Sequence, residues 1–187
     1  MARCNGDDGT ADTQVAQLKA FPPIASNDAE VLILGSMPSV TSLSVQRYYA
    51  HPRNHFWMIM DALFGIDKNL CYAQRCRILI GYRIALWDVI DGCRRHGSLD
   101  ADILEKSIKT NNFNAFFKHH SAIHSVFFNG TKAEQIYGKY VLPTLSANIK
   151  LNYTRLPSTS PANATFSLAE KLKAWRLIKQ NVKQSVL

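Results

Sequence analysis

A short stretch of the chain, YYAHPRN from Tyr48 to Asn54, gathers two aromatic rings, a histidine, an arginine and an amide. Aromatic rings stack on planar groups, and an amide both donates and accepts hydrogen bonds. The stretch precedes an apolar segment that predicts a helix, and the free backbone amides at a helix start favour an anion or a polarised oxygen. Either Tyr48 or Tyr49 can stack on a planar ligand such as a base. The simpler alternative is that one tyrosine is core and Asn54 only caps the helix.

Three other segments carry polar groups that suit a ligand site. GSMPS, from Gly35, allows a ligand close to the backbone because its residues are small. LPSTSPANA presents hydroxyls between two prolines, which favours contacts with phosphate oxygens, although an ordinary surface turn has the same composition. Asp88 interrupts the apolar run ALWDVI, and a lone buried carboxylate is costly. It therefore faces a ligand or partner, or serves as a buried structural acceptor.

The elements that must position these groups follow from four apolar runs separated by helical material: Val31 to Leu34, Ile84 to Ile90, Ile123 to Phe128 and Ile149 to Leu156. This alternation predicts an α/β fold with a largely parallel sheet. Each polar segment falls at or near the end of a run, and ligands of such sheets bind beyond the carboxyl ends of the strands. One helix is expected from Asn54 to Gly65, and another begins at Ser167, with Glu170 in capping-box spacing.

Composition narrows the class of protein. A chain of 187 residues suits one domain, here 21–187, preceded by a loosely ordered arm over residues 1–20. The net charge of +8 favours polyanionic partners, with nucleic acid first among them. The four cysteines form no C-x-x-C pair, and no secretory signal or membrane-length apolar segment is present. We expect a cytoplasmic protein, with no metal site and no membrane association. G-x-G-x-x-G, the nucleotide phosphate loop and the G-x-S-x-G elbow are all absent.

Five motifs in this order resemble the uracil-DNA glycosylase superfamily: LILGSMPSVTSL, YYAHPRNHFW, IALWDV, VFFNGTKA and LPSTSPANA. The resemblance spans about residues 30 to 180. AHPRNHFW is similar to the corresponding segment of mismatch-specific uracil and thymine glycosylases, and the whole pattern is most similar to the sixth branch, the hypoxanthine-DNA glycosylases. The resemblance implies a three-layer α/β/α sandwich around a mostly parallel four-stranded sheet, with the motif loops at the strand ends.

The chain departs from its relatives at two informative positions. Met37 stands where mismatch-specific members carry a catalytic asparagine and uracil-specific members an aspartate, and Asp88 takes the place of an asparagine that reads uracil. The resemblance to the hypoxanthine branch therefore implies Asn54 as the catalytic amide. The predicted base pocket comprises Gly35, Ser36, Met37, Tyr49 and Asp88, and the predicted contacts to the DNA backbone are Ser39, Arg53, Ser158, Thr159 and Ser160.

The expected activity is hydrolysis of the N-glycosidic bond of deoxyinosine, which releases hypoxanthine and leaves an abasic site in DNA. The target base would be flipped out of the helix, at least cost where it is mispaired. No cofactor is implied, and no lysine is marked as a Schiff-base nucleophile, so we expect a monofunctional enzyme, acting as a monomer. The alternatives are a uracil or mismatch glycosylase on the same fold and a non-catalytic sensor of damaged DNA.

Overall fold

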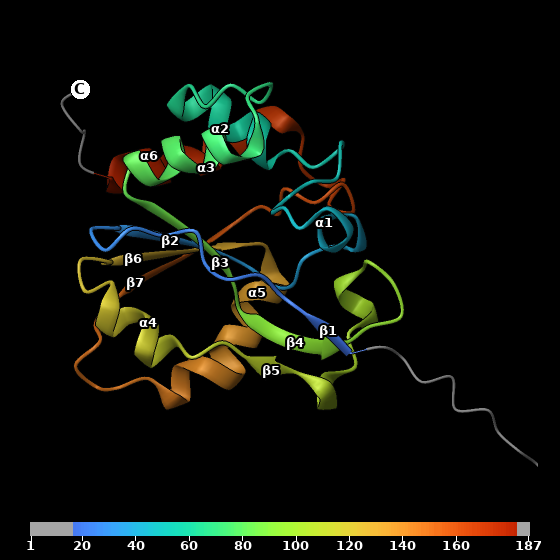
Figure 1. Cartoon of the computed structure of the whole chain (residues 1–187), viewed down its shortest axis with the longest axis vertical. Coiled ribbons are helices and arrows are strands. Elements are labelled where there is room, and N and C mark those ends of the chain that lie inside the picture. The colour runs from blue at the N-terminus through green and yellow to red at the C-terminus, as the bar shows by residue number, and fades with distance from the viewer. Residues whose placement is uncertain (1–16, 183–187) are drawn as a thin grey trace, which may run out of the picture.

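The computed structural model describes residues 17–182, and its centre is a sheet of four parallel strands (Figure 1). The strands are β2 (Val31–Gly35), β3 (Ile84–Asp88), β6 (Ser125–Asn129) and β7 (Asn152–Leu156), in the spatial order β3-β2-β6-β7. Every residue of β2, β3 and β6 is buried, which explains why these strands read as continuous apolar runs. The predicted parallel sheet is confirmed, with each strand inside or within one residue of the run that predicted it.

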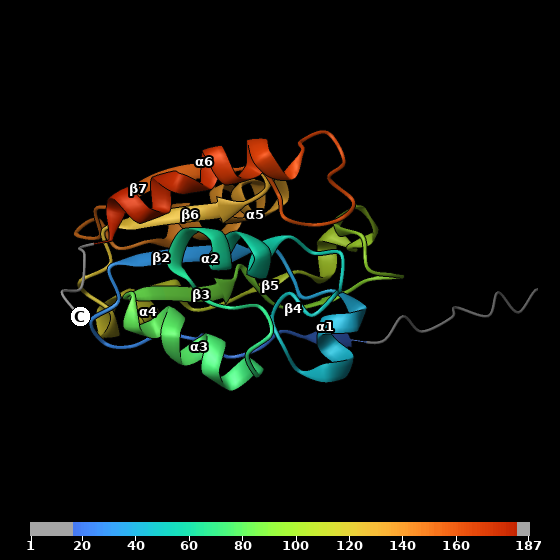
Figure 2. The same ribbon diagram turned by 90° about the horizontal axis from the view of Figure 1, so that it is seen from above.

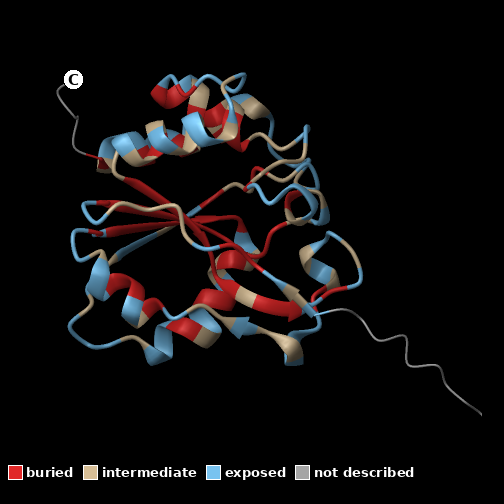
Figure 3. Cartoon of the chain, in the orientation of Figure 1, coloured by how far each residue is buried: buried red, intermediate tan, exposed pale blue. Residues whose placement is uncertain are grey.

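Helices cover both faces of this sheet (Figures 1 and 2). One face carries α2 (Phe56–Phe64), α3 (Tyr72–Gly81) and α6 (Leu168–Asn181), and the other carries α4 (Phe113–His119) and α5 (Thr131–Ile136). The remaining helical turns are α1 (Val40–Val45), η1 (Asp100–Asp102), η2 (Glu105–Ser107), η3 (Tyr137–Val141) and η4 (Leu142–Thr144). Buried positions line the sheet and the inner faces of the helices (Figure 3). The three-layer α/β/α architecture is confirmed.

A second, antiparallel sheet was not predicted. The apolar run expected to form one strand through Ile90 ends as β3 at Asp88, and the chain continues as β4 (Ile90–Arg94). β4 pairs with β1 (Gln17–Lys19) and with β5 (Lys109–Thr110). Residues 17–19 of the expected loose arm thus form a strand, and residues 1–16 of that arm lie outside the described residues.

The helix signals in the sequence have clear structural counterparts. Ser167 caps α6 by accepting a hydrogen bond from the Glu170 amide, and the Glu170 carboxylate accepts one from the Ser167 amide, as predicted. Trp175 and Ile178 on α6 are fully buried. The Trp175 ring meets the Phe56 ring of α2 edge-on, with centroids 5.9 Å apart, so these two helices pack side by side above the sheet.

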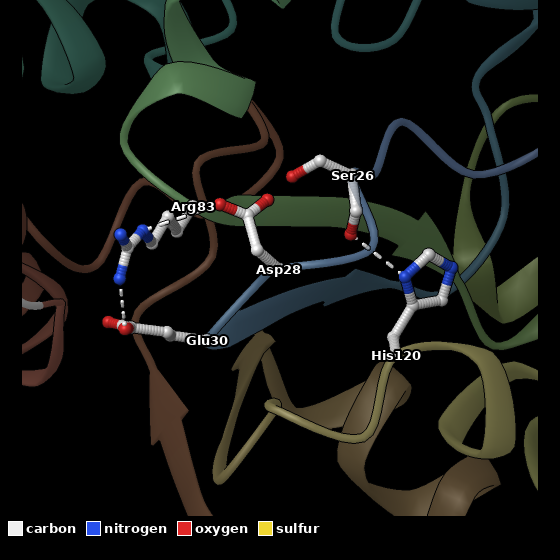
Figure 4. Close-up of polar contacts among 5 residues, drawn as sticks. All are labelled: Ser26, Asp28, Glu30, Arg83 and His120. Carbon is white, nitrogen blue, oxygen red and sulfur yellow. Dashed lines mark hydrogen bonds and ion pairs between the residues drawn. The ribbon is translucent and has the colours of Figure 1, made fainter.

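Ion pairs connect the segments that lead into β2 and β3, at the amino ends of these strands (Figure 4). Arg83, just before β3, pairs with Glu30 at 2.7 Å and with Asp28 at 3.4 Å. The Arg83 carbonyl also accepts the amide of Glu30, immediately before β2. Because Glu30 is almost fully buried, this ion pair is screened less than a surface pair. The amino edge of the sheet is thus closed by structural contacts, and the carboxyl edge carries the cleft described below.

Gly130, after β6, should be intolerant of substitution. Its φ is +99°, and an added Cβ would lie 2.8 Å from the Ser158 Cβ. We expect Gly130→Ala to lower the free energy of unfolding by about 2 kcal/mol in urea denaturation, since it combines backbone strain with a clash. The matched control is Gly81→Ala at the end of α3, where an added Cβ meets nothing within 4 Å. If Gly130→Ala were as stable as wild type, the loop after β6 and the loop after β7 would not be packed tightly against each other.

Candidate active site

The loops at the carboxyl ends of all four parallel strands surround a cleft of about 630 Å³. Ten of the predicted site residues line it: Gly35, Ser36, Met37, Ser39, Tyr49, Asn54, Asp88, Ser158, Thr159 and Ser160. Arg53 is exposed and lies outside the lining. Segments that are distant in the sequence therefore meet at one place, as expected for the carboxyl edge of a parallel sheet.

Asn129, the last residue of β6, holds the loop that follows β7. Its Nδ2 donates to the Thr159 hydroxyl at 2.9 Å, and its Oδ1 accepts the Thr159 amide at 2.8 Å. The Thr159 carbonyl in turn accepts the amide of His55 at the start of α2. Thr159 is fully buried, so its hydroxyl fixes the loop and does not reach a phosphate. This corrects the phosphate contact predicted for Thr159.

Asn54 makes the cap contact that the sequence indicated. Its Oδ1 accepts the backbone amide of Phe56, the first residue of α2, at 3.0 Å. The helix begins at Phe56, with His55 in the N-cap position, one residue after the expected cap at Asn54. Asn54 is half-buried and lines the cleft, and the cap occupies one lone pair of its carbonyl. The amino group and the second lone pair remain for a ligand.

The two tyrosines before this helix have different roles. Tyr48 is core: its hydroxyl donates to the Pro22 carbonyl and only 3% of the residue is exposed. Tyr49 has a φ of +54° and stacks on Phe56, with ring centroids 4.1 Å apart and an interplanar angle of 22°. Phe56 thus supports the Tyr49 ring at the wall of the cleft. Of the two, Tyr49 has the position that a stacking platform requires.

Asp88 ends β3 inside the cleft, and only 3% of it is exposed. A Cβ on its strand partner Gly35 would lie 2.3 Å from Asp88 Oδ1, so a larger residue at 35 would force this carboxyl to move. The other oxygen, Oδ2, is buried without a hydrogen-bond partner. Burial, with a smaller contribution from Asp100, raises the pKa of Asp88 to about 8. The carboxyl is therefore mostly neutral at pH 7.

Charged residues of the cleft region were missed from the sequence: Lys132 and Arg155 line the cleft, and Asp100 and Arg95 bond to the loop after β2. Asp100, in η1, accepts hydrogen bonds from the Ser36 hydroxyl at 2.7 Å and 2.8 Å to its two oxygens. Arg95, following β4, is 4% exposed and donates to the Pro38 carbonyl at 2.6 Å. Asp100 and Arg95 come from the polar stretch RRHGSLDAD, in which no local pattern distinguishes a site residue from a solvated loop.

Two of the three remaining serines of the site keep a hydrogen to donate. Ser158 and Ser160 each accept a backbone amide within their own loop, from Ser160 and Ala162 respectively. Within residues 17–182 neither hydroxyl donates a hydrogen bond, so both suit contacts with anionic oxygens. Ser39 differs, because it caps α1 and donates to the Ser42 hydroxyl.

Within residues 17–182, no group of three or more histidine, cysteine or acidic side chains is arranged to hold a metal ion. The helices in this part of the chain include none with the length and apolar character needed to cross a membrane.

The chain belongs to the uracil DNA glycosylase superfamily, whose family model matches residues 22–179. Among its relatives is a hypoxanthine DNA glycosylase of Methanosarcina acetivorans, 34% identical over 152 residues that cover 80% of this chain and 90% of the relative. A hypoxanthine DNA glycosylase of Methanosarcina barkeri is 32% identical over 160 residues, covering 84% and 94%. The solution NMR structure of a candidate uracil DNA glycosylase from Methanosarcina acetivorans superimposes with a TM-score of 0.70 at 30% identity, covering 88% of this chain and 99% of that one.

The raised pKa of Asp88 predicts how the free energy of unfolding depends on pH. Because the folded protein keeps this proton up to about pH 8 while the unfolded chain loses it near pH 4, stability should fall as pH rises across that window. Asp88→Asn removes the titration, so the variant should exceed wild type in free energy of unfolding by roughly 5 kcal/mol at pH 8. The gain should shrink toward pH 4. Urea titrations at both pH values test this, with Asp61→Asn in α2 as the control. An equal gain at both pH values would contradict it.

Proposed function

We propose that this protein hydrolyses the N-glycosidic bond of deoxyinosine in DNA, releasing hypoxanthine and leaving an abasic site. The observation that carries the proposal is the buried, unpartnered oxygen of Asp88 in a cleft at the strand ends of a DNA glycosylase fold. The two hypoxanthine DNA glycosylases that resemble most of this chain support the choice of base. A cleft of this volume accommodates a flipped nucleotide.

Asp88 is proposed to read the base. A neutral carboxyl both donates and accepts, so its carbonyl oxygen can accept N1–H and its O–H can donate to O6 of hypoxanthine. Tyr49 would stack on the ring, and Gly35, Ser36 and Met37 would lie against its edge. Uracil presents the same pair of adjacent groups, so a uracil glycosylase is the second candidate, and direct substrate competition separates the two.

Asn54 is proposed to act on the sugar side of the flipped nucleotide. A water molecule adds its oxygen to C1′ as the bond from C1′ to N9 breaks, and the bonding electrons leave with the base. The carbonyl of Asn54 orients this water or stabilises the positive charge that develops on the sugar. Its cap contact with Phe56 holds the amide at the helix start, so the side chain needs little reorganisation for this role.

The net charge of +8 and the serine hydroxyls would hold the DNA strand. Ser158, Ser160 and Ser39 are the proposed phosphate contacts at the cleft, and the exposed Arg53 is proposed to contact the backbone beside it. We further propose a monofunctional enzyme that acts as a cytoplasmic monomer without metal or organic cofactor. Its activity should then survive EDTA, and borohydride should trap no covalent adduct with DNA.

The central prediction is base release from matched duplexes that contain one deoxyinosine or one deoxyuridine, with alkali cleavage at the abasic site as the readout. Cutting should occur preferentially at deoxyinosine.

Asn54→Ala should lower the single-turnover rate about 100-fold, as loss of a transition-state contact does. Asn54→Ser is the matched variant, because serine can still cap α2 and should restore stability without restoring the rate. Preference for deoxyuridine would favour the second candidate, and lesion binding without any release would indicate a sensor of damage.

The neutral form of Asp88 predicts a pH dependence. The kcat/KM for deoxyinosine should fall above about pH 8, because ionisation of Asp88 removes the donor hydrogen and places a charge in a buried site. Asp88→Asn keeps one donor and one acceptor, so it should retain the rate within about threefold and lose this alkaline fall. Asp88→Ala should lower kcat/KM about tenfold or more. An alkaline fall that persists in Asp88→Asn would assign it to another group.

A further inference from the structure

The cleft contains a second carboxyl group whose surroundings differ from those of Asp88. Asp100 reaches it from η1, a segment outside the motifs that suggested the site, and lines the same cleft as Asn54 and Asp88. Both of its oxygens accept from the Ser36 hydroxyl. Asp88, in contrast, has one oxygen packed on Gly35 and one without a partner. The Asp100 carboxyl is thus held by a hydrogen-bond donor, and the Asp88 carboxyl is not.

This difference separates the protonation states of the pair. Burial raises the pKa of both groups, but the Ser36 hydroxyl, the Arg95 guanidinium and the Lys132 ammonium each oppose the rise at Asp100. At Asp88 only Arg95 opposes it, and the charge of Asp100 adds to the rise. When two neighbouring carboxyls titrate apart, one is available as a base while the other stays protonated. Asp100 is therefore the member of the pair that ionises more readily.

The neighbouring groups at the cleft are less suited than Asp100 to accept a proton. Met37, beside Ser36, is apolar and 7% exposed, so the loop after β2 supplies hydroxyls but no ionisable group. Arg155 is paired with Glu134 at 2.9 Å. Burial keeps Tyr49 a neutral phenol by raising its pKa. Asn54 is an amide and cannot take up a proton at neutral pH.

We propose that Asp100 is a catalytic carboxylate that accepts the proton of the attacking water, and that Ser36 positions it. The inference rests on the proposed glycosylase function. The oxygen of water bonds to C1′, the bond from C1′ to the base nitrogen breaks, and the base leaves with the electron pair. One water proton passes to the Asp100 carboxylate and then to solvent, from which the departing base takes a proton. Loss of the Asp100 charge removes the acceptor for this proton.

The titration of Asp100 depends on groups from several elements. Asp88 of β3 faces it as a like charge when ionised, Lys132 of α5 and Arg95 face it as cations, and Ser36 after β2 is its hydrogen-bond donor. Its charge also acts on the phenol of Tyr49 and the thiol of Cys93. None of these neighbours is itself expected to need deprotonation for the reaction. The acid side of the rate profile should therefore report Asp100.

The test is single-turnover release of base from a deoxyinosine duplex between pH 5 and 9, with lesion binding followed by fluorescence anisotropy. Asp100→Asn should bind the duplex within about threefold of wild type, lose about 100-fold or more in rate, and lose the acid limb of the profile. Asp102→Asn is the matched control: it makes the same change in the same turn, at a residue outside the cleft lining, and should behave as wild type.

A second variant separates a chemical role from a structural one. Ser36→Ala leaves the Asp100 carboxylate in place but removes the hydrogen bond that opposes the rise of its pKa, so the acid limb of the rate profile should move to higher pH, whatever change in maximal rate the altered pocket brings. A merely structural contact would lower the rate equally at every pH.

The outcomes are distinguishable. An Asp100→Asn variant with a rate within threefold of wild type, or a Ser36→Ala profile with an unshifted acid limb, would overturn the role of Asp100 and leave the proposed glycosylase function standing. Absence of release by the wild-type protein from both deoxyinosine and deoxyuridine would overturn the proposed function and this inference together.

Discussion

The site depends on the pair of hydrogen bonds between Asn129 and Thr159. They fix the loop after β7 to the end of β6, and the Thr159 carbonyl then receives the first free amide before α2. Through that contact the position of Asn54 is tied to two strands of the sheet. Both groups are buried, so leaving either one without its partner would cost about 1 to 3 kcal/mol. The amide of Asn54 is thus held by the sheet, although it lies on a connecting segment.

A second constraint is the burial of charge at the same edge. Asp88 is the last residue of β3, in the parallel sheet. Arg95 and Asp100 follow β4, in the antiparallel sheet. A buried guanidinium needs nearby negative charge, and a buried carboxyl without a donor keeps its proton. The antiparallel sheet of β1, β4 and β5 therefore does more than extend the fold, because it carries Arg95 and the turn with Asp100 to the cleft.

The sequence predicted the parts of the molecule that local rules determine. Buried parallel strands are apolar throughout, so β2, β3 and β6 were visible as runs, and the Ser167 and Glu170 spacing located α6. The contacts that were missed join residues far apart in the chain. Nothing near Thr159 shows that its hydroxyl is held by a residue 30 positions earlier, and Asp100 bonds to Ser36 across 64 positions. β1 and β5 are too short for periodicity to reveal them.

The contact between Gly35 and Asp88 constrains how this site can change during evolution. The two residues are opposite each other in the parallel register, and a side chain at 35 would occupy the space of Asp88 Oδ1. Any residue with a Cβ at 35 would displace the Asp88 carboxyl, whereas a smaller residue at 88 is compatible with glycine at 35. Position 35 is therefore constrained from two sides, because the same Cβ would also lie 3.1 Å from the Tyr49 hydroxyl, and a change at 88 alone would not free it to vary.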